Sequence, residues 1–206
     1  LELFAQLTRD ALSRMPEADR ALEEIRLLGS IVARGLAERV FELEADAGGE
    51  IVDRHLEMTL EGPFSFPRLS GFDQRVVEIR GKADRIDVFA NGDLRVVDYK
   101  LSRVPDVDSS VQIAVYAHAV QQALEARDGR PHRVTQAMYL AFGDERQSEG
   151  RLAPAGEETA AAVRARASDF AAAIDRIEAG EYPPVPKRPA DRSEEHTSEL
   201  QSRFGI

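Results

Sequence analysis

The chain has 206 residues, of which 43% are hydrophobic and 31% are charged. This is the composition of a folded globular protein with a substantial core, and it argues against extensive disorder. The net charge of −10 argues against a protein that binds nucleic acid unaided, because that affinity comes largely from Lys and Arg. Local patches or bound cations can still supply a positive field. No run of about 18 apolar residues is present, so the sequence predicts no membrane-spanning helix.

Cysteine content and the first residues bear on the location of the protein. With no cysteine, the chain has neither a disulfide framework nor a thiolate metal site. It begins LELFAQLTRD, without a basic region ahead of an apolar one, so no signal peptide is indicated. We therefore expect a cytoplasmic protein. Because the first residue is not Met, we also expect the chain to be a fragment of a longer protein.

Two helices are predicted at the start of the chain. The first covers about residues 1–16 and ends at Met15-Pro16, because proline disfavours helix at the residue before it. The second is a long amphipathic helix over about residues 18–46, ended by Gly48-Gly49. Its apolar stripe consists of Leu28, Ile31, Val32, Gly35, Leu36, Val40 and Leu43. A strand over residues 50–61 and a loop rich in Gly, Pro and Ser over residues 62–73 follow.

The stretch from residue 81 to residue 100 is predicted to be a β-hairpin. Asn91-Gly92 separates two β-forming runs, and this dipeptide favours a turn with positive φ at both positions. Because side chains alternate along a strand, Asp98 and Lys100 share one face of the second run. Asp84 aligns with Ile86 and Val88 on the face of the first run that is expected to be half-buried. Two carboxylates and an ammonium group there are costly unless paired, and a divalent cation would pair them.

These charged residues also have purely structural interpretations. Asp84 can pair with Arg85 or Lys82 in a surface salt bridge. Asp98 and Lys100 can form an ion pair on an exposed strand, worth under about 1 kcal/mol. The hairpin by itself therefore leaves a metal site and ordinary ion pairs as alternatives.

The second half of the chain continues with a loop, a helix, a strand and a helix. Residues 102–109 are polar and include Pro105, which predicts a loop. In the helix expected over residues 110–127, Gln112 and Tyr116 lie one turn apart on the same face, which alone would be an ordinary helix face. A strand over residues 134–142 and an alanine-rich helix over residues 157–179, capped by Gly180, complete the pattern.

The end of the chain differs in character from the rest. Residues 192–202 are RSEEHTSELQS, which matches the in-frame translation of a common short-read sequencing adapter. We therefore expect residues 192–206 to be a non-native tail, to be left out of the fold. A native polar tail is the alternative. Residues 1–191 are then expected to form one domain.

Three motifs occur in order along the chain: GKADRID at residues 81–87, VVDYK at residues 96–100 and QIAVY at residues 112–116. Together they resemble the PD-(D/E)XK nuclease superfamily, in particular the RecB-like nuclease domains of bacterial helicase-nucleases. The nearest likeness is to the C-terminal nuclease domain of the AddB-type subunit. The resemblance covers residues 24–189. It implies an α/β fold with a restriction-endonuclease-like core, in which a central mixed β-sheet is flanked by α-helices.

The resemblance also implies a metal site. Asp84 matches the first metal-binding carboxylate of the family, and Asp98 matches the acidic position before Tyr-Lys. The carbonyl oxygen of Tyr99 is a possible further ligand. Oxygen ligands of this kind hold Mg²⁺ or Mn²⁺ with several waters and leave room for a phosphate oxygen.

Three more side chains receive catalytic roles from the same resemblance. Lys100 would orient or help deprotonate the attacking water and stabilise developing negative charge. Gln112 and Tyr116 match the Q-x-x-x-Y helix of the family, which places an amide and a phenol near the DNA backbone. The predicted catalytic set is Asp84, Asp98, Lys100, Gln112 and Tyr116.

Two departures from the family pattern stand out. RecB-like domains commonly carry a metal-binding histidine on their first helix, and Ala33 occupies that position here. Glu38 or Glu57 is a candidate substitute. AddB-type domains usually carry four cysteines that hold an iron–sulfur cluster, so we expect such a cluster in a full-length parent but not in this cysteine-free chain.

The sequence thus predicts a Mg²⁺-dependent deoxyribonuclease domain. The resemblance implies single-stranded DNA as substrate, delivered by a helicase partner subunit during the recombinational repair of double-strand breaks. One alternative is a catalytically silent module that binds DNA or scaffolds such a complex. Another is a CRISPR-associated or phage exonuclease of the same superfamily.

Overall fold

The structure is a computed structural model that describes residues 2–45, 48–68, 73–142 and 149–181. The chain divides into two compact units, residues 1–50 and residues 51–206. Each unit is described by itself. Among the described residues, none of the helices has the length and apolar character needed to cross a membrane. The expected tail at residues 192–206 lies outside the described residues, so its assignment stays a prediction.

The described residues of the first unit form three helices. They are α1 (Glu2–Leu12), α2 (Glu17–Leu28) and α3 (Leu36–Ala45). Pro16 directly precedes α2, where its missing N–H costs nothing. The Nε of Arg9 in α1 lies 3.0 Å from the Oε1 of Glu24 in α2, which ties these two helices together.

The prediction of one long helix over residues 18–46 is wrong, because the chain breaks between α2 and α3. Gly29 ends α2 with a φ of 85°, a conformation that favours glycine. The chain then folds back so closely that a Cβ at Gly29 would lie 2.5 Å from the backbone N of Gly35. Ser30 donates its N–H to the carbonyl of Ala33 at 2.7 Å within this turn. Ala33 therefore lies between two helices, and not on the helix where the family pattern expects a histidine.

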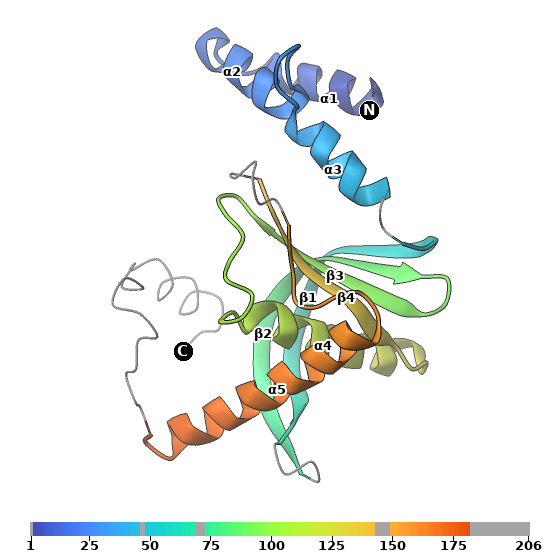
Figure 1. Ribbon diagram of the computed structural model, residues 1–206, viewed down its shortest axis with the longest axis vertical. Coiled ribbons are helices and arrows are strands. Elements are labelled where there is room, and N and C mark those ends of the chain that lie inside the picture. Colours follow the sequence, from blue (N-terminus) through green and yellow to red (C-terminus); the bar gives the residue numbers. More distant parts are fainter. Residues whose placement is uncertain (1, 46–47, 69–72, 143–148, 182–206) are drawn as a thin grey trace. The chain divides into compact units, whose positions relative to one another are not determined.

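The second unit is built on a five-stranded mixed sheet (Figure 1). Its strands are β1 (Ile51–Pro67), β2 (Gln74–Phe89), β3 (Asp93–Lys100), β4 (Arg133–Ala141) and β5 (Glu149–Arg151). They follow one another across the sheet in chain order, and every neighbouring pair is antiparallel except β3 and β4, which are parallel. The short strand β5 was not predicted from the sequence.

Two helices pack on this sheet and close its core. They are α4 (Gln112–Asp128), the crossover between parallel β3 and β4, and α5 (Glu157–Glu178), which follows β5. The helices contact each other, and both contact β4 and β1 (Figure 1). The largest fully buried side chains include Tyr116, Tyr139, Phe66, Leu60, Ile86 and Leu94. Each contributes roughly 1.5–3 kcal/mol by burial. The predicted α/β fold with a restriction-endonuclease-like arrangement is confirmed.

Strand β1 is longer than predicted. Residues 62–67, expected to belong to a loop, continue the strand and pair with β2 as far as Pro67. The reason is burial, since Phe64 and Phe66 are 8% and 0% exposed and lie in the core. Packing of two aromatic rings outweighs the weak strand preference of the glycine and prolines around them.

The predicted hairpin is present, but its turn differs from the expected one. β2 and β3 pair from Arg85 opposite Val97 to Val88 opposite Leu94. Gly92 has a φ of 85°, whereas Asn91 is not in the positive-φ region. The side-chain oxygen of Asn91 instead accepts the N–H of Asp93 at 3.0 Å. A single glycine thus supplies all the left-handed backbone that this turn needs.

Candidate active site

The backbone pairing of β2 with β3 ends at Arg85, and the next link between the two strands is made by the side chain of Asp84. Its Oδ2 accepts the backbone N–H of Tyr99 at 2.8 Å. Because Tyr99 directly follows Asp98, this bond holds Asp84 beside the backbone of the second predicted carboxylate. The two motif strands are therefore joined at the very residues that the sequence singled out.

Asp98, Lys100 and Gln112 are brought together by direct contacts. The Nζ of Lys100 lies 2.9 Å from Oδ2 of Asp98 and donates to Oε1 of Gln112 at 3.1 Å. The Asp98 side chain is 1% exposed and that of Lys100 is 11% exposed. Asp98 and Lys100 thus share a face of β3 as predicted. The ion pair of the structural alternative is therefore present, but not on an exposed strand, because Asp98 is buried and Lys100 is half-buried.

Tyr116 lies one turn after Gln112 on α4, with its side chain buried against the backbone of β2. A Cβ at Gly81 would lie 2.9 Å from the Tyr116 hydroxyl oxygen and 3.2 Å from its ring. Gly81 is the first residue of the GKADRID motif. Its lack of a side chain is what lets the phenol approach the strand that carries Asp84.

Replacing Gly81 with alanine is therefore expected to push Tyr116 out of place. We expect Gly81→Ala to lower the free energy of unfolding by about 1–3 kcal/mol, the usual cost of overpacking. Chemical denaturation would measure the loss. Lys82→Ala is the matched control, because the Lys82 side chain is 54% exposed and its removal crowds nothing. Equal stability of the two variants would show that the contact between Gly81 and Tyr116 is not tight.

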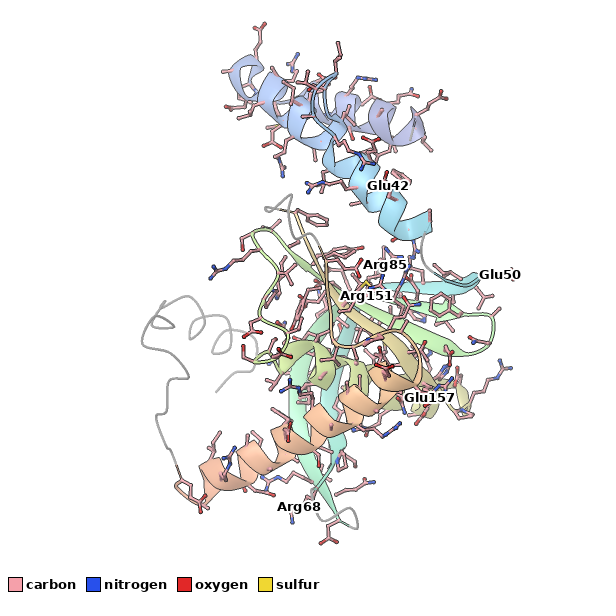
Figure 2. The ribbon with its side chains drawn as sticks, in the orientation of Figure 1. Glu42, Glu50, Arg68, Arg85, Arg151 and Glu157 are labelled. Carbon is pink, nitrogen blue, oxygen red and sulfur yellow. The ribbon has the colours of Figure 1, made fainter. Side chains whose placement is uncertain are left out.

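A second charged cluster, missed in the sequence, is buried around Asp87. The Asp87 side chain is 0% exposed, and its carboxylate accepts hydrogen bonds from Arg54 at 2.6 Å, from Arg95 at 2.7 Å and from Arg85 at 2.7 Å. Of these residues, Figure 2 labels Arg85. Burial raises the pKa of Asp87, but the three arginine hydrogen bonds outweigh it and hold the pKa below its usual value. Asp87 lies opposite Arg95 in the hairpin register, which is the signal that could have revealed this cluster.

The cluster is linked to the candidate site through Tyr99. Nη1 of Arg85 lies 3.2 Å from the Tyr99 hydroxyl, and the Tyr99 ring stacks on Phe142 with centroids 5.5 Å apart. The residue between Asp98 and Lys100 is thus fixed at its backbone by Asp84 and at its side chain by Arg85.

The candidate substitutes for a histidine ligand have other partners. Glu57 pairs with Lys82 at 2.7 Å, and Glu38 pairs with Arg34 at 3.4 Å within the first unit. Within the described ranges, no group of three or more His, Cys, Asp or Glu side chains is arranged to hold a metal ion. The remaining donor set is Asp84, Asp98 and the carbonyl of Tyr99. Two carboxylates and a carbonyl are hard oxygen donors, which fit a Mg²⁺ ion that keeps several of its waters.

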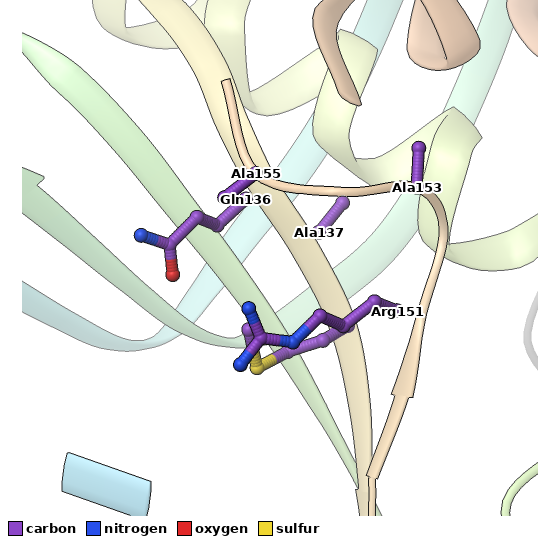
Figure 3. A pocket seen from close by; sticks show the side chains of 6 residues that line it. Gln136, Ala137, Arg151, Ala153 and Ala155 are labelled. Atoms are coloured by element: carbon purple, nitrogen blue, oxygen red, sulfur yellow. The ribbon is translucent and has the colours of Figure 1, made fainter. Parts of the chain in front are cut away.

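A small hollow elsewhere on the second unit offers no comparable chemistry. It lies between β4 and residues 151–155 (Figure 3). Its lining consists of Gln136, Ala137, Met138, Arg151, Ala153 and Ala155. The one charged residue of the lining, Arg151, pairs with Glu149. Without a carboxylate in its lining, this hollow is not a candidate metal or catalytic site.

Comparison with known protein families gives one result. The family model described as the PD-(D/E)XK nuclease superfamily matches residues 2–192. The match spans both structural units and includes every residue of the candidate site. A search of curated proteins finds no match to the chain.

Proposed function

Because the chain belongs to the PD-(D/E)XK nuclease superfamily, we propose that it is a metal-dependent deoxyribonuclease that hydrolyses phosphodiester bonds. The observation that carries this proposal is the placement of one half-buried ammonium group. Lys100 lies between Asp98 and Gln112, and Asp84 is bonded to the intervening backbone of Tyr99. Carboxylates beside a fixed cationic donor are what phosphodiester hydrolysis requires.

In this proposal Asp84, Asp98 and the Tyr99 carbonyl hold Mg²⁺ or Mn²⁺. A divalent ion bound there supplies charge neutralisation at the phosphate and a water of lowered pKa. The hydrogen bond from the Tyr99 N–H fixes one oxygen of Asp84, which leaves its other oxygen for a ligand. Asp98 is buried and already faces one cation, Lys100, so a divalent ion bound there would share this carboxylate with the ammonium group.

Lys100 acts on the substrate in this proposal. Its side chain is 11% exposed, enough to present the ammonium group to a phosphate oxygen or an attacking water. Asp98 and Gln112 restrict its position, so little reorganisation is needed as negative charge develops. Tyr116, one turn along α4, packs beside the strand that carries Asp84 and completes the set.

We also propose the setting in which the domain works. The motifs resemble RecB-like domains, with the nearest likeness to the AddB-type subunit, and this supports a role in a helicase-nuclease complex that processes double-strand breaks. The net charge of −10 supports it too, because an acidic chain binds DNA weakly and a partner subunit would supply the affinity for DNA. The chain has no cysteine and so holds no iron–sulfur cluster itself. Residues 1–191 would form the nuclease domain.

Cleavage of labelled DNA by the full chain tests the proposed activity. We expect Mg²⁺ or Mn²⁺ to support cleavage of a single-stranded oligonucleotide, and removal of divalent ions with a chelator to abolish it. Asp98→Asn is expected to abolish cleavage as well, because the substituted site loses one metal-binding carboxylate. Denaturing gel electrophoresis of the products provides the measurement. Asp108→Asn is the matched control, since the Asp108 side chain is 92% exposed and lies in a loop.

The competing function is a catalytically silent DNA-binding or scaffolding module, favoured by Ala33 and by the acidic charge. Calorimetric titration with Mn²⁺ separates the two, because a scaffold needs no divalent ion. Absence of both cleavage and Mn²⁺ binding in the wild-type chain would contradict the nuclease proposal.

A further inference from the structure

Tyr139, in the middle of β4, is a buried residue that none of the sequence motifs includes. It is 0% exposed, and the register of the parallel pair places it opposite Asp98. Its ring centroid lies 5.5 Å from the Nζ of Lys100. An ammonium group at this distance from an aromatic ring is attracted to the face of the ring. The ring of Tyr139 is thus a third group in contact with the Lys100 ammonium, in addition to Asp98 and Gln112.

The hydroxyl of Tyr139 makes hydrogen bonds at the start of α4. It accepts the backbone N–H of Ile113 at 3.1 Å and lies 2.6 Å from the Oγ of Ser110. Helix α4 lacks a side-chain cap at Val111, so the first-turn N–H groups need another acceptor. The phenol oxygen provides one, and it does so from a neighbouring strand.

The contact of the Tyr139 ring with Lys100 and that of its hydroxyl with Ile113 both involve a direct neighbour of Gln112. Gln112 is the first residue of α4, directly before Ile113, and its side chain accepts a hydrogen bond from Lys100. One side chain therefore fixes both the ammonium group and the helical turn that carries its amide partner. Burial raises the pKa of Tyr139 to about 12, with the charge of Asp98 acting in the same direction. The phenol stays protonated at neutral pH, so it is suited to hold other groups rather than to exchange protons.

We propose that Tyr139 is a positioning residue of the nuclease, which sets the location of Lys100 through its ring and that of Gln112 through its hydroxyl. This inference rests on the proposed function for its effect on cleavage. It does not rest on that function for the contact between the Tyr139 ring and Lys100, which can be measured without cleavage.

Two substitutions of Tyr139 separate the effect of its hydroxyl from that of its ring. Tyr139→Phe keeps the ring and removes the hydroxyl, and we expect kcat to fall about tenfold with KM unchanged. Tyr139→Leu also removes the ring, and we expect kcat to fall about 10²-fold, the usual effect of a small misplacement of a reacting group. Thr159→Val is the control for loss of a buried hydroxyl, because Thr159 is 0% exposed and bonds only the carbonyls of Ala153 and Pro154 in the described contacts. It is expected to leave kcat unchanged.

Nuclear magnetic resonance provides a readout that does not depend on cleavage. The chain has three lysines, Lys82, Lys100 and Lys187, so a sample labelled with ¹³C at lysine Cε gives few signals. The signal that is absent from the spectrum of Lys100→Met is assigned to Lys100. We expect the Lys100 signal to lose its ring-induced displacement in Tyr139→Leu and to keep it in Tyr139→Phe.

The outcomes distinguish this inference from the proposed function. Wild-type cleavage with an unchanged kcat in Tyr139→Leu, or a Lys100 signal that does not move in that variant, would overturn the positioning role. A wild-type chain that does not cleave, together with a Lys100 signal that moves in Tyr139→Leu, would overturn the nuclease activity and support the contact between the Tyr139 ring and Lys100.

Discussion

Lys100→Met is expected to lower the rate of DNA cleavage by about 10²–10³ while leaving the fold intact. The substitution keeps the length of the side chain and removes the ammonium group that lies between Asp98 and Gln112. Lys82, the other lysine among the described residues, pairs instead with Glu57 at 2.7 Å. Single-turnover cleavage of a labelled oligonucleotide at saturating Mg²⁺ would measure the loss, and circular dichroism would confirm the fold.

Lys82→Met is the matched control for this experiment. It also removes one ammonium group from the hairpin region, but from a side chain that is 54% exposed. We expect its cleavage rate to equal that of the wild type. Mn²⁺ binding by Lys100→Met should be retained or tighter, because Asp98 loses a competing cation. An equal loss of cleavage in both lysine variants would assign the effect to net charge rather than to the site.

The part of the fold that was predictable depends on short-range patterns. Alternation along residues 94–100 places Asp98 and Lys100 on one face, and the structure has them 2.9 Å apart. The one-turn spacing of Gln112 and Tyr116 likewise puts both on the side of α4 that meets the sheet. Such relations follow from the two periods of regular structure, which need no knowledge of distant residues.

The parts that were missed all depend on residues distant in sequence or on close backbone approach. The break after α2 requires Gly29 and Gly35 to pass within contact distance, which a helical periodicity does not reveal. Continuation of β1 to Pro67 depends on burial of Phe66 in the core. The contacts of Tyr139 with α4 and Lys100 depend on a crossover that carries α4 over the sheet between β3 and β4. Topology, rather than local preference, decides these features.

The buried cluster around Asp87 is expected to dominate the stability of the hairpin. Asp87→Asn would leave three guanidinium groups, two of them on residues 3% exposed, facing a neutral amide. We expect the free energy of unfolding to fall by about 3–5 kcal/mol, the usual cost of removing one partner of a buried ion pair. Urea denaturation would measure it. Asp53→Asn is the matched control on β1, because the Asp53 side chain is 58% exposed and should contribute little.

The pH dependence of the unfolding free energies of wild type and Asp87→Asn tests whether the charge of Asp87 causes the loss of stability. Arginine hydrogen bonds hold the pKa of Asp87 below its usual value in the folded state, against the opposing effect of burial. A carboxylate of lowered pKa contributes stability that is fully present above the unfolded pKa of about 4 and is lost as pH falls through the folded pKa. The difference in unfolding free energy between wild type and Asp87→Asn should therefore be constant from about pH 7 to pH 5 and shrink in stronger acid. A difference that stays constant to the lowest measurable pH would mean that packing, and not the carboxylate charge, makes Asp87 necessary.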